Sequence, residues 1–268
     1  MEKIMIINSG SSSLKFKLFN NETHETLASG IIERIGIHGS KIKVKYGAGQ
    51  KYELDHEITN HLQGIELLLN VLKELNLIAD LSEIKGIGHR VVAGGEYFSQ
   101  PVIVDNDVIA KIKELAQLAP LHNPANLNGI KAFRKYLPNS LSVAVFDTAF
   151  HQTLPQENYM YSTPYEWYEK CGVRRYGAHG ISHEYVARKA AELMGRPFEE
   201  LKLITCHLGA GASITAIKYG RSFDTSMGFT PLSGIQMATR AGDVDISLAN
   251  YIMKKLDIQS MSDMVYLL

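Results

Sequence analysis

Short runs of apolar and β-branched residues, separated by Gly and Asn, dominate the first third of the chain. Five such runs lie within residues 3–58, and their lengths and compositions predict β-strands. From residue 61 to residue 77 the apolar positions take up helical spacing, which predicts a helix. Residues 83–95 then predict a strand that leads into a glycine-rich turn, and residues 106–118 predict a second helix.

The middle of the chain changes character. Residues 118–126 contain two prolines and predict a loop. The apolar run at 141–150 is continuous instead of alternating, which is typical of a strand with both faces covered. After it, residues 180–195 predict a helix, with Ser182 as its N-cap and Gly195 as its end.

Three further strands are predicted at 201–209, 212–220 and 221–229, and a further helix at 246–256. This order of elements predicts two α/β lobes in close contact. No low-complexity linker separates them, and we place the boundary near residue 150, which gives domains 1–150 and 151–268.

Two glycine- and serine-rich loops occupy equivalent places in the two lobes. Residues 8–13, NSGSSS, and residues 207–213, HLGAGAS, each join two apolar strands. Small residues let backbone N–H groups approach an anion, and serine hydroxyls add donors. The alternative is a pair of ordinary hairpins, but the repetition favours a nucleotide whose phosphates lie between the lobes. Neither loop matches a P-loop or a dinucleotide fingerprint.

Composition narrows the class of protein. Apolar residues make up 45% of the chain, which is ordinary for a folded protein. The 28 basic residues balance 28 acidic ones, so the chain has no net positive charge that would favour binding to nucleic acid. The two cysteines, Cys171 and Cys206, support neither a metal site nor a disulfide framework and are expected to be structural thiols. No apolar stretch approaches the length of a signal peptide or a membrane span. We therefore expect a cytoplasmic protein without a membrane segment.

Five charged or titratable residues stand at strand ends or in loops among apolar neighbours: Arg90, His122, Asp147, His179 and Arg240. Such a residue either forms a structural pair or points into a cleft, and the sequence leaves both alternatives open at each position.

Seven segments, in order along the whole chain, resemble the acetokinase family of acetate, propionate and butyrate kinases. They are INSGSSSLKF, GHRVV followed by GGE, APLHNPAN, VAVFDTAFHQT, RRYG followed by HGISHEYV, HLG followed by GASITAI, and DTSMGFTPLSG followed by TRAGDVD. The resemblance implies two ribonuclease-H-like lobes, as in sugar kinases, Hsp70 and actin, with the nucleotide between them. It also implies reversible transfer of a phosphoryl group from ATP to acetate, giving ADP and acetyl phosphate.

The resemblance assigns roles residue by residue. Arg90 and Arg240 bind the carboxylate and the phosphoryl group, His179 stabilises the transition state, His122 supports phosphoryl binding, and Asp147 acts on Mg²⁺ and its waters. Asn8 is assigned to the metal site, which binds Mg²⁺ or, as a substitute, Mn²⁺. Ser11 and Ser13 face the same region. The acyl pocket is formed by Arg90, Val92, Leu121 and Pro231. Nucleotide contacts are assigned to Lys15, His207, Leu208, Gly209, Ala210 and Gly211.

Four positions depart from the family pattern: Ala93, Ala178, Ala210 and Ile246. Ala210 removes a side-chain donor near the phosphates and is expected to weaken nucleotide binding. Ala178 replaces a phenylalanine beside His179 and either enlarges the acyl pocket for propionate or butyrate, or leaves a gap that a neighbouring side chain fills.

Members of the family are longer than this chain, so the resemblance implies a second lobe that is incomplete and half a nucleotide site. Two functions are therefore expected as alternatives: an acyl kinase, or a catalytically impaired fragment that binds nucleotide or acyl phosphate. The resemblance further implies a homodimer. A sugar kinase is disfavoured because the candidate residues are Arg and His instead of an acidic base and a polar sugar pocket.

Overall fold

The alternating runs of the first third form one large mixed sheet. The computed structural model describes all 268 residues, and the chain divides into two units, Met1–Phe146 and Asp147–Leu268. The strands of the first unit are β1 (Lys3–Ser9), β2 (Ser13–Asn20), β3 (Thr26–Glu33), β4 (Lys41–Tyr46), β5 (Gln50–Asp55), β6 (Ile84–Val91), β7 (Val102–Ile103) and β8 (Leu141–Phe146). Their order across the sheet is β5-β4-β3-β2-β1-β6-β8-β7.

Strands β1 to β5 form an antiparallel meander, whereas β6 pairs with β1 and β8 pairs with β6 in parallel. Strand β7 pairs with β8 in the antiparallel direction. The parallel pairs bring the carboxyl ends of β1, β6 and β8 to the same edge of the sheet. This edge carries Asn8 and Arg90.

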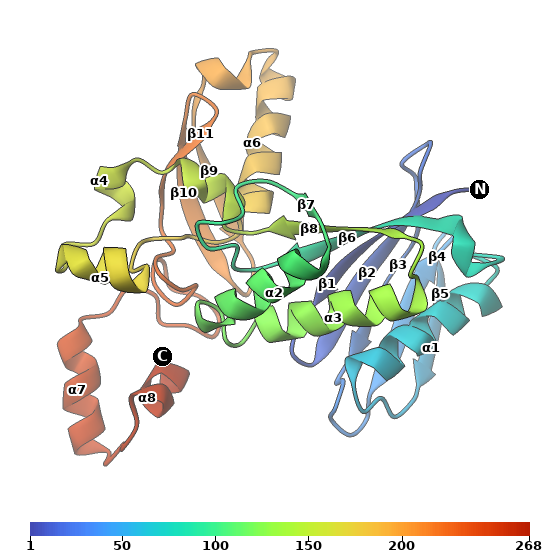
Figure 1. The fold of residues 1–268 in the computed structure, drawn as a ribbon, viewed down its shortest axis with the longest axis horizontal. Helices are drawn as coiled ribbons and strands as arrows, with labels where there is room; N and C mark the ends of the chain where they lie inside the picture. The colour runs from blue at the N-terminus through green and yellow to red at the C-terminus, as the bar shows by residue number, and fades with distance from the viewer. The chain divides into compact units, whose positions relative to one another are not determined.

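One face of this sheet is covered by helices α1 (His61–Glu74) and α3 (Asn123–Tyr136), with α2 (Asn106–Glu114) packed against α3 (Figure 1). Met5 and Ile7 of β1 point into this core together with Leu68 and Phe133 from the helices, and each is at most 1% exposed. Ile6, between them, faces the opposite side and is 48% exposed. The alternation along β1 therefore decides which face binds the helices.

Helix α3 overturns the prediction of a loop over the whole of residues 118–126. The helix begins at Asn123, and Pro124 lies in its first turn. Proline fits there because the first N–H groups of a helix have no intrahelical partner and the fixed φ of proline is already helical. The second proline of the segment therefore starts a helix instead of prolonging the loop.

The second unit contains a three-stranded antiparallel sheet in the order β11-β10-β9. Its strands are β9 (Lys202–Leu208), β10 (Ala212–Lys218) and β11 (Arg221–Thr225), and its helices are α4 (Gln156–Tyr159), α5 (Tyr165–Cys171), α6 (Gly180–Met194), α7 (Ile246–Lys255) and α8 (Met261–Leu267). Helix α6 packs on β9. Its Ala187 and Ala191 are buried with Phe150, Phe198 and Ile217.

The prediction of Ser182 as the N-cap of α6 is wrong, while Gly195 ends the helix as predicted. The helix begins two residues after the sequence RRYGA, at Gly180, and its N-cap is His179. The Ser182 hydroxyl lies 2.9 Å from Nδ1 of His207 on β9, so it contacts a histidine instead of the helix end. Gly195 has φ of 61°, a left-handed conformation that glycine adopts without steric cost.

Strand β9 lies at the edge of its sheet, and its alternate residues point outward. Ile204 is 74% exposed and Leu208 is 75% exposed, with Cys206 exposed between them. Both cysteines are free, but neither belongs to a core, since Cys171 is exposed as well. The expectation of packed structural thiols is therefore wrong, because an apolar sequence neighbourhood does not fix the side of a strand to which a residue points.

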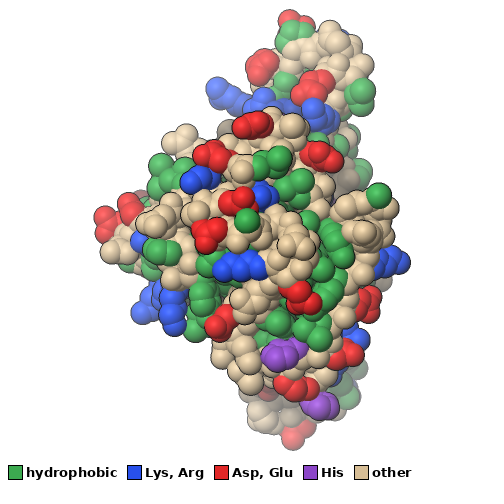
Figure 2. Space-filling view, turned by 90° about the vertical axis from the view of Figure 1, so that its right-hand side faces the viewer, with side chains coloured by type: hydrophobic (Ala, Val, Ile, Leu, Met, Phe, Trp, Pro, Cys, Tyr) green, Lys and Arg blue, Asp and Glu red, His purple; other side chains and the backbone are tan.

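The surface shows no segregation of charge by sign on the face drawn in Figure 2, where basic and acidic side chains are interspersed. This agrees with the formal net charge of zero. Every helix of the structure is too short or too polar to cross a membrane.

The buried His89 on β6 is expected to make the stability of the protein fall as the pH becomes acidic. It is 2% exposed, its ring centroid lies 5.7 Å from that of Phe133, and burial lowers its pKa from 6.5 to about 4. The folded protein therefore holds His89 neutral, whereas the unfolded chain binds a proton as the pH falls below 6.5. This contribution to the free energy of unfolding is complete above pH 6.5 and is lost progressively down to about pH 4.

We expect the His89→Phe variant to show a shallower loss of stability between pH 7 and pH 5 than the unsubstituted protein. Urea unfolding at the two pH values measures the difference. Since carboxylates titrate equally in both proteins, only the difference between them reports on His89. Parallel pH profiles would contradict the prediction.

Candidate functional site

The hairpin loop between β9 and β10 is built from small residues, and two side chains that the sequence singled out, His179 and Arg240, approach it. The Gly209 N–H donates to the Gly211 carbonyl oxygen at 3.1 Å, which closes the loop. A Cβ atom added to Gly211 would lie 2.6 Å from Nη2 of Arg240 and 3.4 Å from Nε2 of His179. A side chain at position 211 would therefore displace the guanidinium group of Arg240, whereas glycine lets the arginine and the histidine approach the loop.

Arg240 is held at this loop by its own segment. Its Nη1 donates to the carbonyl oxygen of Pro231 at 2.7 Å, which orients the guanidinium group. Burial lowers the pKa of Arg240, because desolvation disfavours its charged form. An anion bound beside the guanidinium group would offset this desolvation, and a planar guanidinium suits two oxygens at once.

His179 lies at the start of α6 in a left-handed conformation, with φ of 59°. Such a backbone costs a residue other than glycine about 1–2 kcal/mol, so the surrounding contacts must hold it in place. Its ring stacks on that of His207, with centroids 4.1 Å apart and planes inclined by 22°. His207 thus packs against His179 at the base of the hairpin.

Asp147 is fixed at the same helix start through the backbone. The Gly180 N–H donates to the Asp147 carbonyl oxygen at 2.8 Å, and a Cβ atom at Gly180 would collide with that oxygen. The Asp147 residue is 2% exposed. Within the second unit the structure therefore brings together His179, His207, Gly211 and Arg240, and fixes Asp147 beside the start of α6.

The first unit brings together Asn8, Lys15 and Arg90. Nη1 of Arg90 donates to Oδ1 of Asn8 at 3.3 Å, across the parallel strands β1 and β6. Lys15 lies opposite Asn8 in the β1–β2 hairpin. The loop of this hairpin is closed by the Gly10 N–H, which donates to the Ser13 carbonyl oxygen at 2.7 Å.

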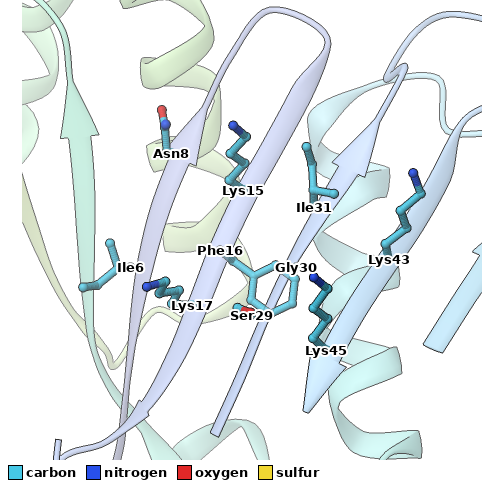
Figure 3. A pocket seen from close by; sticks show the side chains of 10 residues that line it. All are labelled: Ile6, Asn8, Lys15, Phe16, Lys17, Ser29, Gly30, Ile31, Lys43 and Lys45. Carbon is cyan, nitrogen blue, oxygen red and sulfur yellow. The ribbon is translucent and has the colours of Figure 1, made fainter. Parts of the chain in front are cut away.

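A hollow of about 540 Å³ lies on the face of this sheet that carries no helix, and Asn8 and Lys15 stand at one end of it (Figure 3). Its walls include three further lysines, Lys17, Lys43 and Lys45, which sequence reasoning did not single out. Lys43 forms an ion pair of 2.7 Å with Glu33. Ile31 on β3 supplies apolar surface between the lysines, and Ile6 on β1 supplies it at the side of the hollow.

Two buried asparagines of α3, which sequence reasoning missed, tie the ends of β1 and β6 together. Nδ2 of Asn126 donates to the Ser9 carbonyl oxygen at 2.6 Å, and the Val92 N–H donates to Oδ1 of Asn126 at 3.1 Å. Asn123 exchanges two hydrogen bonds of 3.0 Å with the backbone of Ala93. The amides therefore position the chain next to Asn8 and Arg90. The only sequence signal was the recurrence of Asn at a three-residue interval beside Pro124.

The predicted acyl-pocket residues differ in burial. Val92 is 8% exposed and packs with Ala93 and Ala119, whereas Leu121 is 74% exposed. His122 directly precedes α3 and is exposed. Pro231, in the second unit, is half-buried beside Arg240.

The side chain of Ala178 packs against other side chains of its own unit. It is 2% exposed and forms a cluster with Ala212, Met227 and Met237. Methionine is flexible enough to fill irregular gaps in a core. Within the second unit, Met227 and Met237 thus pack against Ala178.

No group of three or more His, Cys, Asp or Glu side chains gathers anywhere in the chain in a way that could hold a metal ion. This does not conflict with Mg²⁺, which commonly keeps several waters and binds through one or two carboxylates together with substrate phosphates. The carboxylate of Asp147 and the amide oxygen of Asn8 are the donor types that Mg²⁺ accepts.

A model of the acetokinase family matches residues 3–268. Acetate kinases from Fructilactobacillus sanfranciscensis and Enterococcus faecalis are each 56% identical over all 268 residues, and the chain covers 68% of each of them. Among solved structures, an acetate kinase from Porphyromonas gingivalis is 43% identical, with a TM-score of 0.92 over 99% of this chain and 68% of the other. A propionate kinase from Francisella tularensis is 42% identical, with a TM-score of 0.93 over 100% of this chain and 68% of the other.

The fold and the motifs thus define a phosphotransferase with the α/β architecture of the acetate kinase structures. The chain spans about two thirds of the length of these relatives. It belongs to the acetokinase family.

Proposed function

We propose that this protein is an acetate kinase, which transfers the γ-phosphoryl group of ATP to acetate and runs in reverse with acetyl phosphate and ADP. The observation that carries the proposal is the convergence of His179 and Arg240 on the glycine-rich β9–β10 loop in a chain of the acetokinase family. A donor, a cation and a loop of small residues are what a phosphate-rich substrate requires.

The chemistry explains why the proposed residues are arginines and histidines. A carboxylate such as acetate is ionised at pH 7, since carboxyl groups of this kind titrate near pH 4, so it needs no general base. One of its oxygens forms the new bond to phosphorus, while the bond from phosphorus to the bridging oxygen of ATP breaks and ADP leaves with the electron pair. The protein has to bring two anions together and to stabilise the equatorial oxygens of the moving group.

We assign the roles accordingly. Arg90 and Arg240 bind the carboxylate and the phosphoryl group, His179 donates to an equatorial oxygen, and His122 supports phosphoryl binding. The residues 207–211 and Lys15 contact the nucleotide, and Val92, Leu121 and Pro231 contact the acyl group. Mg²⁺, held through Asp147 and Asn8 together with water, would neutralise charge on the phosphates. In this assignment the acyl-site residues belong to the first unit except Pro231, and the phosphate loop belongs to the second.

The test is the formation of acetyl hydroxamate from ATP, Mg²⁺, acetate and hydroxylamine. We expect product that depends on all of ATP, Mg²⁺ and acetate. If no product forms while ATP or acetyl phosphate still raises the melting temperature, the protein binds its ligands without turnover. If neither occurs, the proposal is wrong.

Propionate is the second candidate acceptor, because a propionate kinase is among the structural relatives. Met227 and Met237 fill the space beside Ala178, so we expect acetate to remain the preferred acceptor despite the small residue. One methylene group in such a pocket is worth about 1–3 kcal/mol, or roughly ten- to two-hundredfold in kcat/KM. The rates with acetate, propionate and butyrate measure this preference. A higher kcat/KM for propionate than for acetate would show that the two methionine side chains move aside for the extra methylene group.

We also propose that the protein forms the homodimer implied by the family resemblance and acts in the cytoplasm. Light scattering of the purified protein tests the first of these two statements. A monomer at micromolar concentration would contradict it.

A further inference from the structure

A continuous chain of buried hydrogen bonds runs to His179 from inside the second unit. Nδ1 of His179 lies 2.8 Å from the Ser213 hydroxyl, and the same hydroxyl lies 2.8 Å from Nε2 of His183. Nδ1 of His183 in turn lies 2.7 Å from the Thr205 hydroxyl. Ser213 is 0% exposed, His183 is 1% exposed and Thr205 is 6% exposed. Their hydrogen-bonding groups must therefore find partners within the protein.

His183, in the middle of the chain, is neutral at physiological pH. Its pKa falls from 6.5 to about 3, first because it is buried and then because three other histidines surround it: His151, His179 and His207. A neutral imidazole has one N–H and one bare nitrogen, and a hydroxyl has one hydrogen. While His179 is neutral, the hydrogen bonds that link Thr205, His183, Ser213 and His179 can therefore be donated in only two directions: all toward His179 or all toward Thr205.

The partners of Thr205 distinguish the two directions. If the Thr205 hydroxyl donates to Nδ1 of His183, then Nε2–H of His183 donates to Ser213, and the Ser213 hydroxyl donates to Nδ1 of His179. Both hydroxyl hydrogens and the N–H of His183 then have an acceptor. In the opposite direction the Thr205 hydroxyl accepts from His183, and its own hydrogen has no acceptor, because His183 is the only side-chain or backbone partner of that hydroxyl in the structure.

The favoured direction leaves the proton of His179 on Nε2. This nitrogen faces the β9–β10 loop, since a Cβ atom on Gly211 would lie 3.4 Å from it. The stacked ring of His207, whose Nδ1 is 2.9 Å from the Ser182 hydroxyl, holds the plane of the His179 ring. A proton on Nε2 makes a hydrogen-bond donor there, whereas the other tautomer would present a lone pair that repels phosphoryl oxygens.

We propose that Ser213, oriented by His183 and Thr205, is a positioning residue that holds His179 in the Nε2–H tautomer and so directs a hydrogen-bond donor at the glycine-rich loop. That the donor serves a phosphoryl oxygen rests on the function proposed above. The tautomer itself does not, because it follows from the hydrogen bonds of the free protein.

The test is nitrogen-15 NMR of protein labelled at histidine, in which a protonated and a bare imidazole nitrogen have well separated chemical shifts. In the unsubstituted protein we expect the His179 signals to show a proton on Nε2 and a bare Nδ1. A proton on Nδ1 in the neutral ring would overturn the proposal, whether or not the protein is active.

Two variants separate positioning from general packing. Ser213→Ala removes the donor to Nδ1, so we expect a mixture of His179 tautomers and a roughly tenfold or larger loss of kcat in the hydroxamate assay, with little change in the KM for ATP. Ser222→Ala is the matched control, because it removes a buried serine that lies 2.8 Å from Nδ1 of a different histidine, His151. It should leave the His179 signals unchanged.

If Ser213→Ala does not fold, Thr205→Val can be used instead, because it removes the hydroxyl at the other end of the same series of hydrogen bonds. We expect it to shift the His179 tautomer in the same sense. Unchanged His179 signals in a folded Ser213→Ala or Thr205→Val protein would overturn the proposal. If the unsubstituted protein makes no hydroxamate but shows the expected tautomer, the proposed function fails and the positioning role stands.

Discussion

Replacement of Arg240 by alanine is expected to lower kcat for acetyl hydroxamate formation by about a hundred- to a thousandfold. The guanidinium group is oriented by the Pro231 carbonyl and lies against Gly211, so it meets an anion without reorganisation. Losing one such oriented group in an enzyme costs about 3–4 kcal/mol of transition-state stabilisation. The effect should appear in kcat more than in the KM for ATP, because the charge is needed most as the phosphoryl group moves.

Two further variants sharpen this prediction. Arg240→Lys should restore little activity, since an ammonium group cannot donate to two oxygens in one plane. Arg221→Ala is the matched control, because it removes an exposed guanidinium group from β11 of the same unit. Near-normal turnover in a folded Arg240→Ala protein would remove Arg240 from the proposed site.

Replacement of Asn126 by alanine is expected to lower the free energy of unfolding of the first unit by about 2–4 kcal/mol. The change leaves the Val92 N–H and the Ser9 carbonyl without their partner, and each unpaired buried group costs about 1–3 kcal/mol. Because Asn126 is 4% exposed, water cannot readily replace the lost amide. Urea unfolding monitored by circular dichroism measures the loss.

Asn128→Ala is the matched control, since Asn128 is an exposed residue of the same helix. Alanine has the higher helix propensity, so this variant should be as stable as the unsubstituted protein or slightly more so. Equal stability of the Asn126→Ala and Asn128→Ala proteins would show that the buried amide contributes no net stability.

Local patterns predicted the elements that local chemistry determines. The β1–β2 and β9–β10 hairpins follow from alternating residues around short loops of Gly and Ser, and α1 follows from apolar spacing alone. Helix α3 was missed altogether, because Pro124 indicates a loop as readily as a helix start and no helix was predicted for the residues that follow it. Proline has the same backbone in both cases, and only the residues that follow distinguish them.

The candidate site was predicted less completely, for a different reason. The motifs identified His179 and Arg240, but not the contacts that orient them. The Asn126 amide bonds to Ser9, 117 positions away, and the Ser213 hydroxyl bonds to His179, 34 positions away. Asn and Ser are common on surfaces, so nothing in the sequence marks these two as buried. Their roles follow from the fold alone.

The exposed side of β9 has a practical consequence for work with this protein. An unpaired strand that displays Ile204 and Leu208 can accept the equivalent strand of another molecule, which leads to aggregation. The thiol of Cys206 lies on the same side, so contact between two such strands would also favour intermolecular disulfides once oxygen is present. Storage with a reducing agent, or a lysine at position 204 to repel a second strand, should therefore keep the purified protein in solution.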